Sequence, residues 1–443
     1  MGGIAVIAKA AGHRVTGCDV NVYPPMSTQL VSLGIELISG YEADQIALKP
    51  EVWVVGNVVT RGNPLMEAIL DRGDRYISGP QWLADNALLG RSVLAVAGTH
   101  GKTTTSSMLA WILEHAGLAP GFLIGGVPLD FGTSAKLGRG KHFVIEADEY
   151  DTAFFDKRSK MIHYRAVVGV LNNIEFDHAD IFPDLASIET QFHHFVRTIP
   201  RSGSLVVNGT DTVIERVLAR GCWTPVERFG VKDGWTAAQI DGRRFQVLRN
   251  GEAIGDLNLE LQGEHNLRNA LAAIAAANAA GVPGGDAIEA LGRFRGVRRR
   301  MELRGTAENV TVWDDFAHHP TAIATTVSGL RQQVGSARIL AVLEPRSNTM
   351  KSGVMKDRLA PSLEEADRVF CYTANLGWDA VAALAPLGVR VRTESDLQKL
   401  VEAILSEARP GDQILIMSNG AFGGIHDLLL KQLSARKVPA ARA

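Results

Sequence analysis

The sequence predicts an α/β protein made of more than one domain. Short segments rich in Val, Ile and Leu alternate with helix-length segments almost throughout the chain, which favours parallel sheets. The chain has 443 residues, and compact domains usually contain about 100–200 residues. A glycine-bracketed loop at 98–104 joins an apolar strand to a helix, as a nucleotide-binding α/β domain requires. Three domains are therefore the working interpretation.

The first domain is predicted at residues 1–88. Residues 2–12 form a helix in this interpretation, and the strand and glycine loop that should precede it are missing. Because the first strand of a doubly wound sheet is central, we expect a gap in the middle of the sheet, about ten residues short. An upstream start codon is the preferred explanation. The expected strands are 14–20, 35–40, 52–59 and 75–78.

The second domain is predicted at 89–298 and the third at 299–443. The second is expected to close with the Ala-rich helix 265–281, which Gly281 and Pro283 terminate. The basic stretch 294–305 is interpreted as a turn-like linker. Strands are expected at 91–97, 142–147, 166–171 and 203–209 in the second domain, and at 310–316, 338–345, 368–373, 389–393 and 412–420 in the third.

Composition argues against several classes of partner. The chain has 46 Lys and Arg against 48 Asp and Glu, a formal net charge of −2, so no global basic field attracts nucleic acid or an anionic membrane. No apolar run reaches the ~18 residues of a membrane span. Cys18, Cys222 and Cys371 form no metal or disulfide pattern and are expected to be ordinary thiols. These features predict a cytoplasmic protein with small-molecule partners, as a monomer or weak homodimer.

The loop at 98–104 is the first candidate site. Its glycines allow backbone N–H groups to converge on phosphate oxygens, and the helix start adds partial positive charge. The usual spacing asks for a glycine where Val96 stands. The competing interpretation is a tight turn with a solvated lysine, which the strand–loop–helix context disfavours. The predicted phosphate-binding residues are Gly98, Thr99, His100, Gly101, Lys102, Thr103 and Thr104.

This short-spaced loop, "GTHGKTT", resembles that of the Mur ligase superfamily. The resemblance implies a three-domain architecture: a Rossmann-like UDP-binding domain, a central P-loop ATPase domain and a C-terminal Rossmann-like domain. It also implies that ATP activates a carboxylate for amide-bond formation, with Mg²⁺. The P-loop interpretation places Thr103 at a magnesium ion, and by the same resemblance Glu146 and His178 help to hold magnesium. Phe192 stands where several relatives have a carbamoylated lysine, so that modification is not expected.

Three further motifs match the superfamily in order. "GEHNLRNALAA" implies that His265, Asn266 and Asn269 lie at the adenine, although helix capping and packing remain an alternative for Asn269. "GVRRRMEL" places Arg300 near the adenine as well. "DDFAHHPT" places Asp315 and His318 near the ribose and the reacting groups. Either Asp315 or His318 could accept the proton of an attacking amine.

Five narrower stretches resemble the Mur ligases that join UDP-N-acetylmuramate to L-alanyl-γ-D-glutamyl-meso-diaminopimelate in peptidoglycan recycling; they are "CDVNVYPPMSTQL", "NVVTRGNP", "EADEYDTAFFDKRSKMIHY", "LEPRSNTMKSG" and "MSNGAFGGIH". Arg346 is expected to bind a peptide carboxylate, and a surface salt bridge is an equally weighted alternative. The alternative functions are ligation of L-alanine or of a folate-linked glutamate, and a nucleotide-gated sensor without catalysis. The implied peptide-binding residues are Arg346, Ser347 and Asn348, and the implied UDP-sugar-binding residues are Gly2, Gly3, Asp19, Asn21, Asn57 and Asn63.

Overall fold

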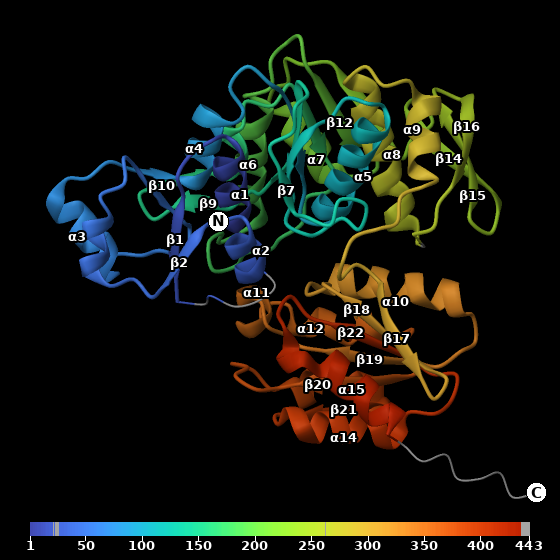
Figure 1. Cartoon of the computed structure of the whole chain (residues 1–443). Coiled ribbons are helices and arrows are strands. Elements are labelled where there is room, and N and C mark those ends of the chain that lie inside the picture. The colour runs from blue at the N-terminus through green and yellow to red at the C-terminus, as the bar shows by residue number, and fades with distance from the viewer. Residues whose placement is uncertain (21, 23–25, 262, 436–443) are drawn as a thin grey trace, which may run out of the picture. The chain divides into compact units, whose positions relative to one another are not determined.

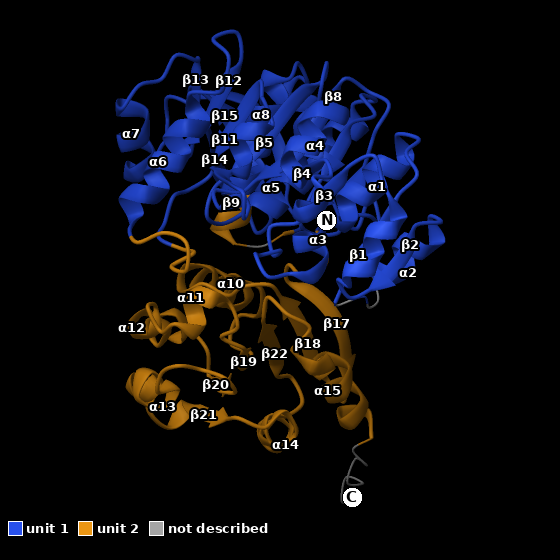
Figure 2. Cartoon of the chain, turned by 90° about the vertical axis from the view of Figure 1, so that its left-hand side faces the viewer, with its two compact units in different colours: residues 1–176, 184–260, 268–296 blue, residues 177–183, 261–267, 297–443 orange. Residues whose placement is uncertain are grey.

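The computed structural model describes residues 1–20, 22, 26–261 and 263–435 (Figure 1). The chain forms two compact units (Figure 2). The first contains 1–176, 184–260 and 268–296, and the second contains 177–183, 261–267 and 297–443. Two short excursions, 177–183 and 261–267, therefore group with the C-terminal part of the chain although their neighbours in sequence group with the first unit.

The N-terminal part of the first unit contains two separate two-stranded parallel sheets. β1 (Thr16–Asp19) pairs with β2 (Glu36–Ser39), and β3 (Trp53–Val55) pairs with β4 (Tyr76–Ser78). In the described part of the chain no backbone ladder joins the two pairs. The accompanying helices are α1 (Gly2–Ala10), α2 (Met26–Ser32), η1 (Ala43–Leu48), α3 (Pro64–Arg72) and α4 (Gly79–Asn86).

A ten-stranded mixed sheet forms the core of the first unit, in the order β16-β15-β14-β13-β12-β11-β5-β8-β6-β7. Its central strands are parallel and apolar because both faces are covered; residues 93–97 of β5 are at most 1% exposed. The strands are β5 (Ser92–Ala97), β6 (Gly121–Leu123), β7 (Ala135–Lys136), β8 (His142–Ala147), β11 (Val168–Leu171), β12 (Ser204–Asn208), β13 (Val226–Phe229), β14 (Trp235–Asp241), β15 (Arg244–Arg249) and β16 (Glu252–Asn258).

The expectation of purely parallel sheets was incomplete. β14, β15 and β16 form an antiparallel meander at one edge, and β7 is antiparallel at the other. The β15–β16 connection is Asn250-Gly251, with φ of 51° and 84°, which suits a two-residue hairpin turn. A small hairpin of β9 (Asp151–Ala153) and β10 (Asp156–Ser159) leads into the short helix η2 (Lys160–His163).

Helices cover the large sheet of the first unit. They are α5 (Lys102–His115), α6 (Leu185–Val196), α7 (Thr212–Ala219), α8 (Glu264–Ala279) and α9 (Gly284–Leu291) (Figure 1). The Ala-rich α8 ends as predicted: Gly281 follows with φ 96°, and Pro283 then precedes α9. Small side chains on α8 bring its backbone close to the sheet, since residues 272–277 are fully buried.

The second unit is built on a six-stranded sheet in the order β17-β18-β22-β19-β20-β21, parallel except for β17. The linker interpretation of 294–305 was wrong at its C-terminal end, because β17 begins at Glu302 and pairs with β18. The strands are β17 (Glu302–Ala307), β18 (Val310–Asp315), β19 (Ile339–Leu343), β20 (Arg368–Tyr372), β21 (Val391–Glu394) and β22 (Gln413–Met417). The helices are α10 (Pro320–Val334), α11 (Asn348–Lys351), α12 (Lys356–Leu359), η3 (Pro361–Leu363), α13 (Ala380–Leu384), η4 (Ala385–Arg390), α14 (Leu397–Glu407), η5 (Phe422–Gly424) and α15 (Ile425–Ser434).

Two sequence expectations concern the whole chain. All three cysteines are free thiols, and burial raises the pKa of Cys371 to about 12. Across the described residues, no helix combines the length and the apolar character needed to cross a bilayer.

Candidate active site

The loop between β5 and α5 has the backbone of a phosphate cradle. Gly98 has φ 145° and Gly101 has φ 79°, values that L side chains rarely adopt. A Cβ atom at Gly101 would lie 2.4 Å from Asn269 Oδ1, so even an alanine has no room there. Backbone geometry and close packing therefore both require this glycine.

A network of buried polar side chains packs against the loop and holds its conformation. The Asn172 amide donates to Thr105 Oγ1 at 2.9 Å, and the Thr105 hydroxyl donates to Asn269 Oδ1 at 3.1 Å. Asn173 fixes the loop from its side, because its Oδ1 accepts from His100 N at 2.7 Å and its Nδ2 donates to His100 O at 3.1 Å. Asn269, expected at the adenine, therefore packs against the loop.

Lys102 opens α5 and lies among carboxylates. Its Nζ donates to Gly98 O at 2.6 Å and to Glu149 Oε2 at 3.2 Å, and lies 3.6 Å from Asp148 Oδ1. Burial alone would lower the pKa of Lys102, but the carboxylates of Glu149, Asp148 and Glu146 outweigh burial and raise it. Lys102 is therefore a fixed cation at the start of the helix.

Glu146 stands near the end of β8 and faces the start of α5. Its Oε2 accepts from Gly125 N at 2.7 Å, and the Thr103 hydroxyl hydrogen-bonds to the carboxylate. Burial, followed by repulsion from Asp148, raises the pKa of Glu146. Its Oε1 is buried and makes no hydrogen bond to any described residue. An orphaned carboxylate oxygen beside a threonine hydroxyl is a donor set that suits a hard cation such as Mg²⁺.

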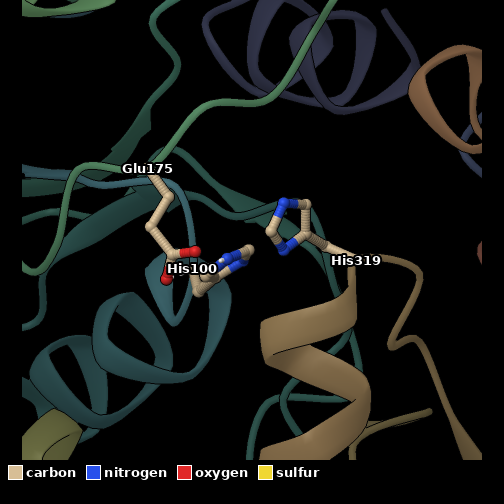
Figure 3. Close-up of side chains that lie close together, drawn as sticks. All are labelled: His100, Glu175 and His319. Atoms are coloured by element: carbon tan, nitrogen blue, oxygen red, sulfur yellow. Dashed lines mark ion pairs between the residues drawn. The ribbon is translucent and has the colours of Figure 1, made fainter. Parts of the chain in front are cut away.

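His100 and Glu175 form a second polar pair on this face of the first unit. His100 Nε2 lies 3.7 Å from Glu175 Oε1 (Figure 3). Glu175 is held through its backbone, because its N–H donates to Thr99 Oγ1 at 2.8 Å and its carbonyl accepts from that hydroxyl at 3.2 Å. The loop after β11 and the phosphate loop are thereby tied together.

His178 lies in the excursion 177–183 of the second unit. It has φ 53°, and its N–H donates to Asp177 Oδ1 at 2.7 Å. The Thr349 hydroxyl also donates to Asp177 Oδ1 at 2.8 Å, and Asn348 Nδ2 donates to Asp180 Oδ2 at 2.8 Å. Burial opposes the ionised form of Asp177, but His178 and the Thr349 hydroxyl lower its pKa to about 2. The excursion is thus anchored on α11.

Asp315 and His318 follow β18 in the second unit. Asp315 is 5% exposed; its carboxylate accepts from Met301 N and Ala317 N, both at 2.8 Å, and from the Thr326 hydroxyl at 3.3 Å. Burial raises the pKa of Asp315, and Arg300 opposes the rise. His318 Nδ1 lies 2.9 Å from Phe316 O, and burial lowers its pKa. If Nδ1 is the donor, Nε2 is an acceptor.

The remaining expected adenine residues also belong to the second unit. The Arg300 guanidinium lies 4.9 Å from the centroid of the Phe316 ring. Burial lowers the pKa of His265 to about 4, so its ring is neutral near pH 7, and Asn266 is 8% exposed. His319, which caps α10 by accepting from Thr321 N at 3.3 Å, was not singled out in the sequence (Figure 3).

The expected UDP-sugar residues divide into packing and exposed positions. Cβ atoms at Gly2 and Gly3 would lie 2.6 Å from Met26 Sδ and 2.4 Å from Leu123 Cδ1, so both glycines allow α1 to pack closely. Asn63 caps α3 by accepting from Met66 N at 3.0 Å. Asp19, the last residue of β1, and Asn57, which follows β3, are both exposed. Asn21 lies outside the described residues.

The expected peptide-binding segment starts after β19. Arg346 is exposed, and its Nη1 would lie 2.0 Å from a Cβ at Gly420, so the guanidinium rests on the loop that follows β22. That loop is held by Ser418, whose hydroxyl donates to Glu344 and accepts from Gly420 N. Ser347 caps α11 by accepting from Met350 N at 3.3 Å, and Asn348 bonds to Asp180 as described above. Their side chains are therefore engaged structurally.

Within the first unit, the structure brings together the phosphate loop, Lys102, Thr103 and Glu146. Sequence reasoning missed the partners of Lys102, namely Asp148 and the 2% exposed Glu149. The signal was present, since both follow Glu146 in the acidic run after β8.

Comparison with known protein families gives three matches along the chain. Residues 1–91 match the Mur ligase family catalytic domain, 96–277 the Mur ligase middle domain, and 299–420 the Mur ligase glutamate ligase domain. Enzymes of this family use ATP, typically with Mg²⁺.

Two relatives carry the name UDP-N-acetylmuramate–L-alanyl-γ-D-glutamyl-meso-2,6-diaminoheptandioate ligase. The protein from Escherichia coli is 54% identical, with 100% of this chain and 97% of the relative covered. The protein from Haemophilus influenzae is 51% identical, with 98% and 97% covered. A UDP-N-acetylmuramate–L-alanine ligase from Acidithiobacillus ferrooxidans is 33% identical, with 96% and 94% covered.

Solved structures support the same assignment. A murein peptide ligase from Psychrobacter arcticus is 44% identical and superposes with a TM-score of 0.78, covering 99% of this chain and 97% of that one. An UDP-N-acetylmuramate–alanine ligase from Thermotoga maritima, 23% identical, shares the fold with a TM-score of 0.82 and the same coverage. The chain therefore belongs to the Mur ligase family, with its three-domain α/β fold, and is an enzyme of the ligase class.

Proposed function

We propose that this ligase joins UDP-N-acetylmuramate to L-alanyl-γ-D-glutamyl-meso-diaminopimelate and converts ATP to ADP and phosphate. The observation that carries the proposal is the 54% identity, over the whole chain, to a relative named for this reaction. We further propose the domain boundaries 1–88, 89–298 and 299–443, for the UDP-sugar, ATP and peptide respectively.

The reaction begins with ATP in the loop 98–104. The lactyl carboxylate of UDP-N-acetylmuramate attacks the γ-phosphorus, the bond to the β-phosphate oxygen breaks, and an acyl phosphate and ADP form. Lys102 and the backbone N–H groups of the loop stabilise negative charge on the phosphate oxygens in the transition state. Two observations support this role: the positive φ of Gly98 and Gly101, which shapes the loop, and the raised pKa of Lys102, which keeps the lysine charged.

Thr103 and Glu146 are the residues of the first unit that would hold Mg²⁺, and the buried free oxygen of Glu146 supports this assignment. The family resemblance adds His178 from the second unit. When bound, Mg²⁺ offsets the charge of the terminal phosphates.

The amine of the tripeptide then attacks the acyl carbon, and a tetrahedral intermediate expels phosphate and leaves an amide. Of the two candidates for proton acceptor we favour His318. Burial keeps its imidazole neutral near pH 7, whereas three donors occupy the carboxylate of Asp315. Asp315 then positions two segments, because its carboxylate accepts from Met301 N before β17 and from Ala317 N after β18.

The acceptor comparison tests the function. The purified chain is given ATP, Mg²⁺ and UDP-N-acetylmuramate with either tripeptide or L-alanine, and the products are identified by mass spectrometry. We expect the tripeptide conjugate, with L-alanine consumed far more slowly. Preferential use of L-alanine would favour the alanine ligase, and ATP binding without either product would favour the non-catalytic sensor.

A further inference from the structure

A single carboxylate of the first unit, that of Asp148, lies between two lysines. Lys102 Nζ is 3.6 Å from Asp148 Oδ1, and Lys160 Nζ is 3.6 Å from Asp148 Oδ2. The side chains are 14%, 21% and 16% exposed for Lys102, Asp148 and Lys160. Lys102 is also paired with the buried Glu149 at 3.2 Å, so the charge available to a further anion comes mainly from Lys160.

The fold fixes Lys160 and does not leave it as a mobile surface side chain. Its backbone N–H donates to Tyr150 O at 3.2 Å, and the next N–H, of Met161, donates to Asp148 O at 3.3 Å. Its ammonium lies 3.9 Å from the centroid of the Tyr150 ring, a close cation–π contact. The Tyr150 phenol in turn hydrogen-bonds to the Asp148 carboxylate. Partial burial of a lysine costs free energy, and the contacts with Asp148 and Tyr150 offset this cost.

The place of Lys160 suggests what it binds. On one side it shares Asp148 with Lys102, the proposed partner of the γ-phosphate. The helix η2, which Lys160 opens, also contacts α4 of the proposed UDP-sugar domain, because His163 Nδ1 lies 3.0 Å from Gln81 Oε1. A sugar acid that reaches from that domain to the γ-phosphate would therefore pass Lys160.

We propose that Lys160, supported by Tyr150, forms an anion subsite that binds the lactyl carboxylate of UDP-N-acetylmuramate and directs it toward the γ-phosphate beside Lys102. This inference rests on the donor substrate of the proposed function. The subsite counters the repulsion between the carboxylate and the triphosphate and orients the attacking oxygen. Lys160 supplies charge and position and transfers no proton.

The test compares two ligands that differ only in the lactyl group. UDP-N-acetylglucosamine lacks the carboxylate of UDP-N-acetylmuramate, so the ratio of their dissociation constants isolates its recognition. Calorimetry on the full chain should show that the unaltered protein prefers UDP-N-acetylmuramate. Lys160→Met should reduce this preference about tenfold or more while the affinity for UDP-N-acetylglucosamine is retained. Lys160→Arg, which keeps the charge, should recover part of it.

Lys157→Met is the matched control. Lys157 lies in β10, just before the helix η2 that Lys160 opens, pairs with Asp151 at 2.5 Å and has a 71% exposed side chain, so the preference should not change. If Lys160→Met unfolds at the assay temperature, Lys160→Gln replaces it. An equal loss of affinity for both nucleotide sugars would show a purely structural lysine and overturn the proposal, as would an unaltered protein without any preference.

This experiment is independent of the amide-forming step. Failure to make the tripeptide conjugate would refute the proposed function, yet a carboxylate preference that depends on Lys160 would still support the subsite. Conversely, a competent ligase whose preference survives Lys160→Met would refute the subsite alone.

Discussion

Helices α1 and α5 both begin beside glycines, but these glycines differ in backbone conformation. Gly98 and Gly101, before α5, have positive φ and shape the loop that joins β5 to α5. Gly2 and Gly3 are themselves helical and make room for Met26 and Leu123. The comparison teaches that glycine at a helix start indicates a phosphate loop only where positive φ and a preceding strand accompany it.

The largest expected effect is at the cation of the phosphate loop. Lys102→Ala removes charge from the transition state, and we expect the ligation rate to fall by about 10²–10³-fold or more. It also leaves the 2% exposed Glu149 without its cation, a loss of about 3 kcal/mol of stability. Steady-state kinetics and chemical denaturation measure the two effects. Adding Glu149→Gln should restore much of the stability but none of the rate; recovered ligation would contradict the assigned role.

The next effect concerns the conformation of the loop. Gly101→Ala forces a side chain into φ 79° and to within 2.4 Å of Asn269 Oδ1. We expect at least about tenfold weaker ATP binding, because the N–H groups no longer converge. Calorimetry with ATP measures it. Undiminished affinity would show that the loop does not hold the phosphates.

At α1 the same substitution should act on packing alone. Gly3→Ala brings a methyl group to 2.4 Å from Leu123 Cδ1, so we expect about 1–3 kcal/mol lower stability with unchanged ATP affinity. Gly285→Ala in α9 is the control: no atom lies within 4 Å of its Cβ, and a gain of up to about 1 kcal/mol is expected. Weaker ATP binding in Gly3→Ala would erase the distinction between the two helix starts.

The start of α8 is a third helix start with a glycine before it, and the effect expected there is smaller. Gly263, with φ 94°, precedes α8, and its Cβ would lie 2.7 Å from the His265 ring. Burial lowers the pKa of His265 from 6.5 to about 4. Between these two pKa values the folded state binds fewer protons than the unfolded state. The free energy of unfolding is therefore highest above about pH 6.5 and falls as the pH falls toward 4. His265→Gln removes this titration, so the denaturation midpoint of the variant should depend less on pH over that range. The same pH dependence in the variant and the unaltered protein would contradict the lowered pKa of His265.

Local features were predictable from sequence and long-range ones were not. The phosphate loop, the strands beside it and the end of α8 depend on glycines and apolar runs within a few residues. The meander β14–β16 was missed although Asn250-Gly251 is a strong hairpin signal. Asn63 and Ser347 look like ligand-binding residues in sequence, but in the structure they cap helices. Lys160 acquires its role only through pairing with Asp148 and Tyr150, which no local pattern encodes.

The central claim is that ATP activates the sugar carboxylate as an acyl phosphate. UDP-N-acetylmuramate labelled with ¹⁸O in its lactyl carboxylate tests this claim most directly, with mass analysis of the inorganic phosphate released during ligation to the tripeptide. The mechanism predicts one carboxylate oxygen in each phosphate, because the oxygen that attacks phosphorus leaves with it. Amide formation with unlabelled phosphate would contradict the account.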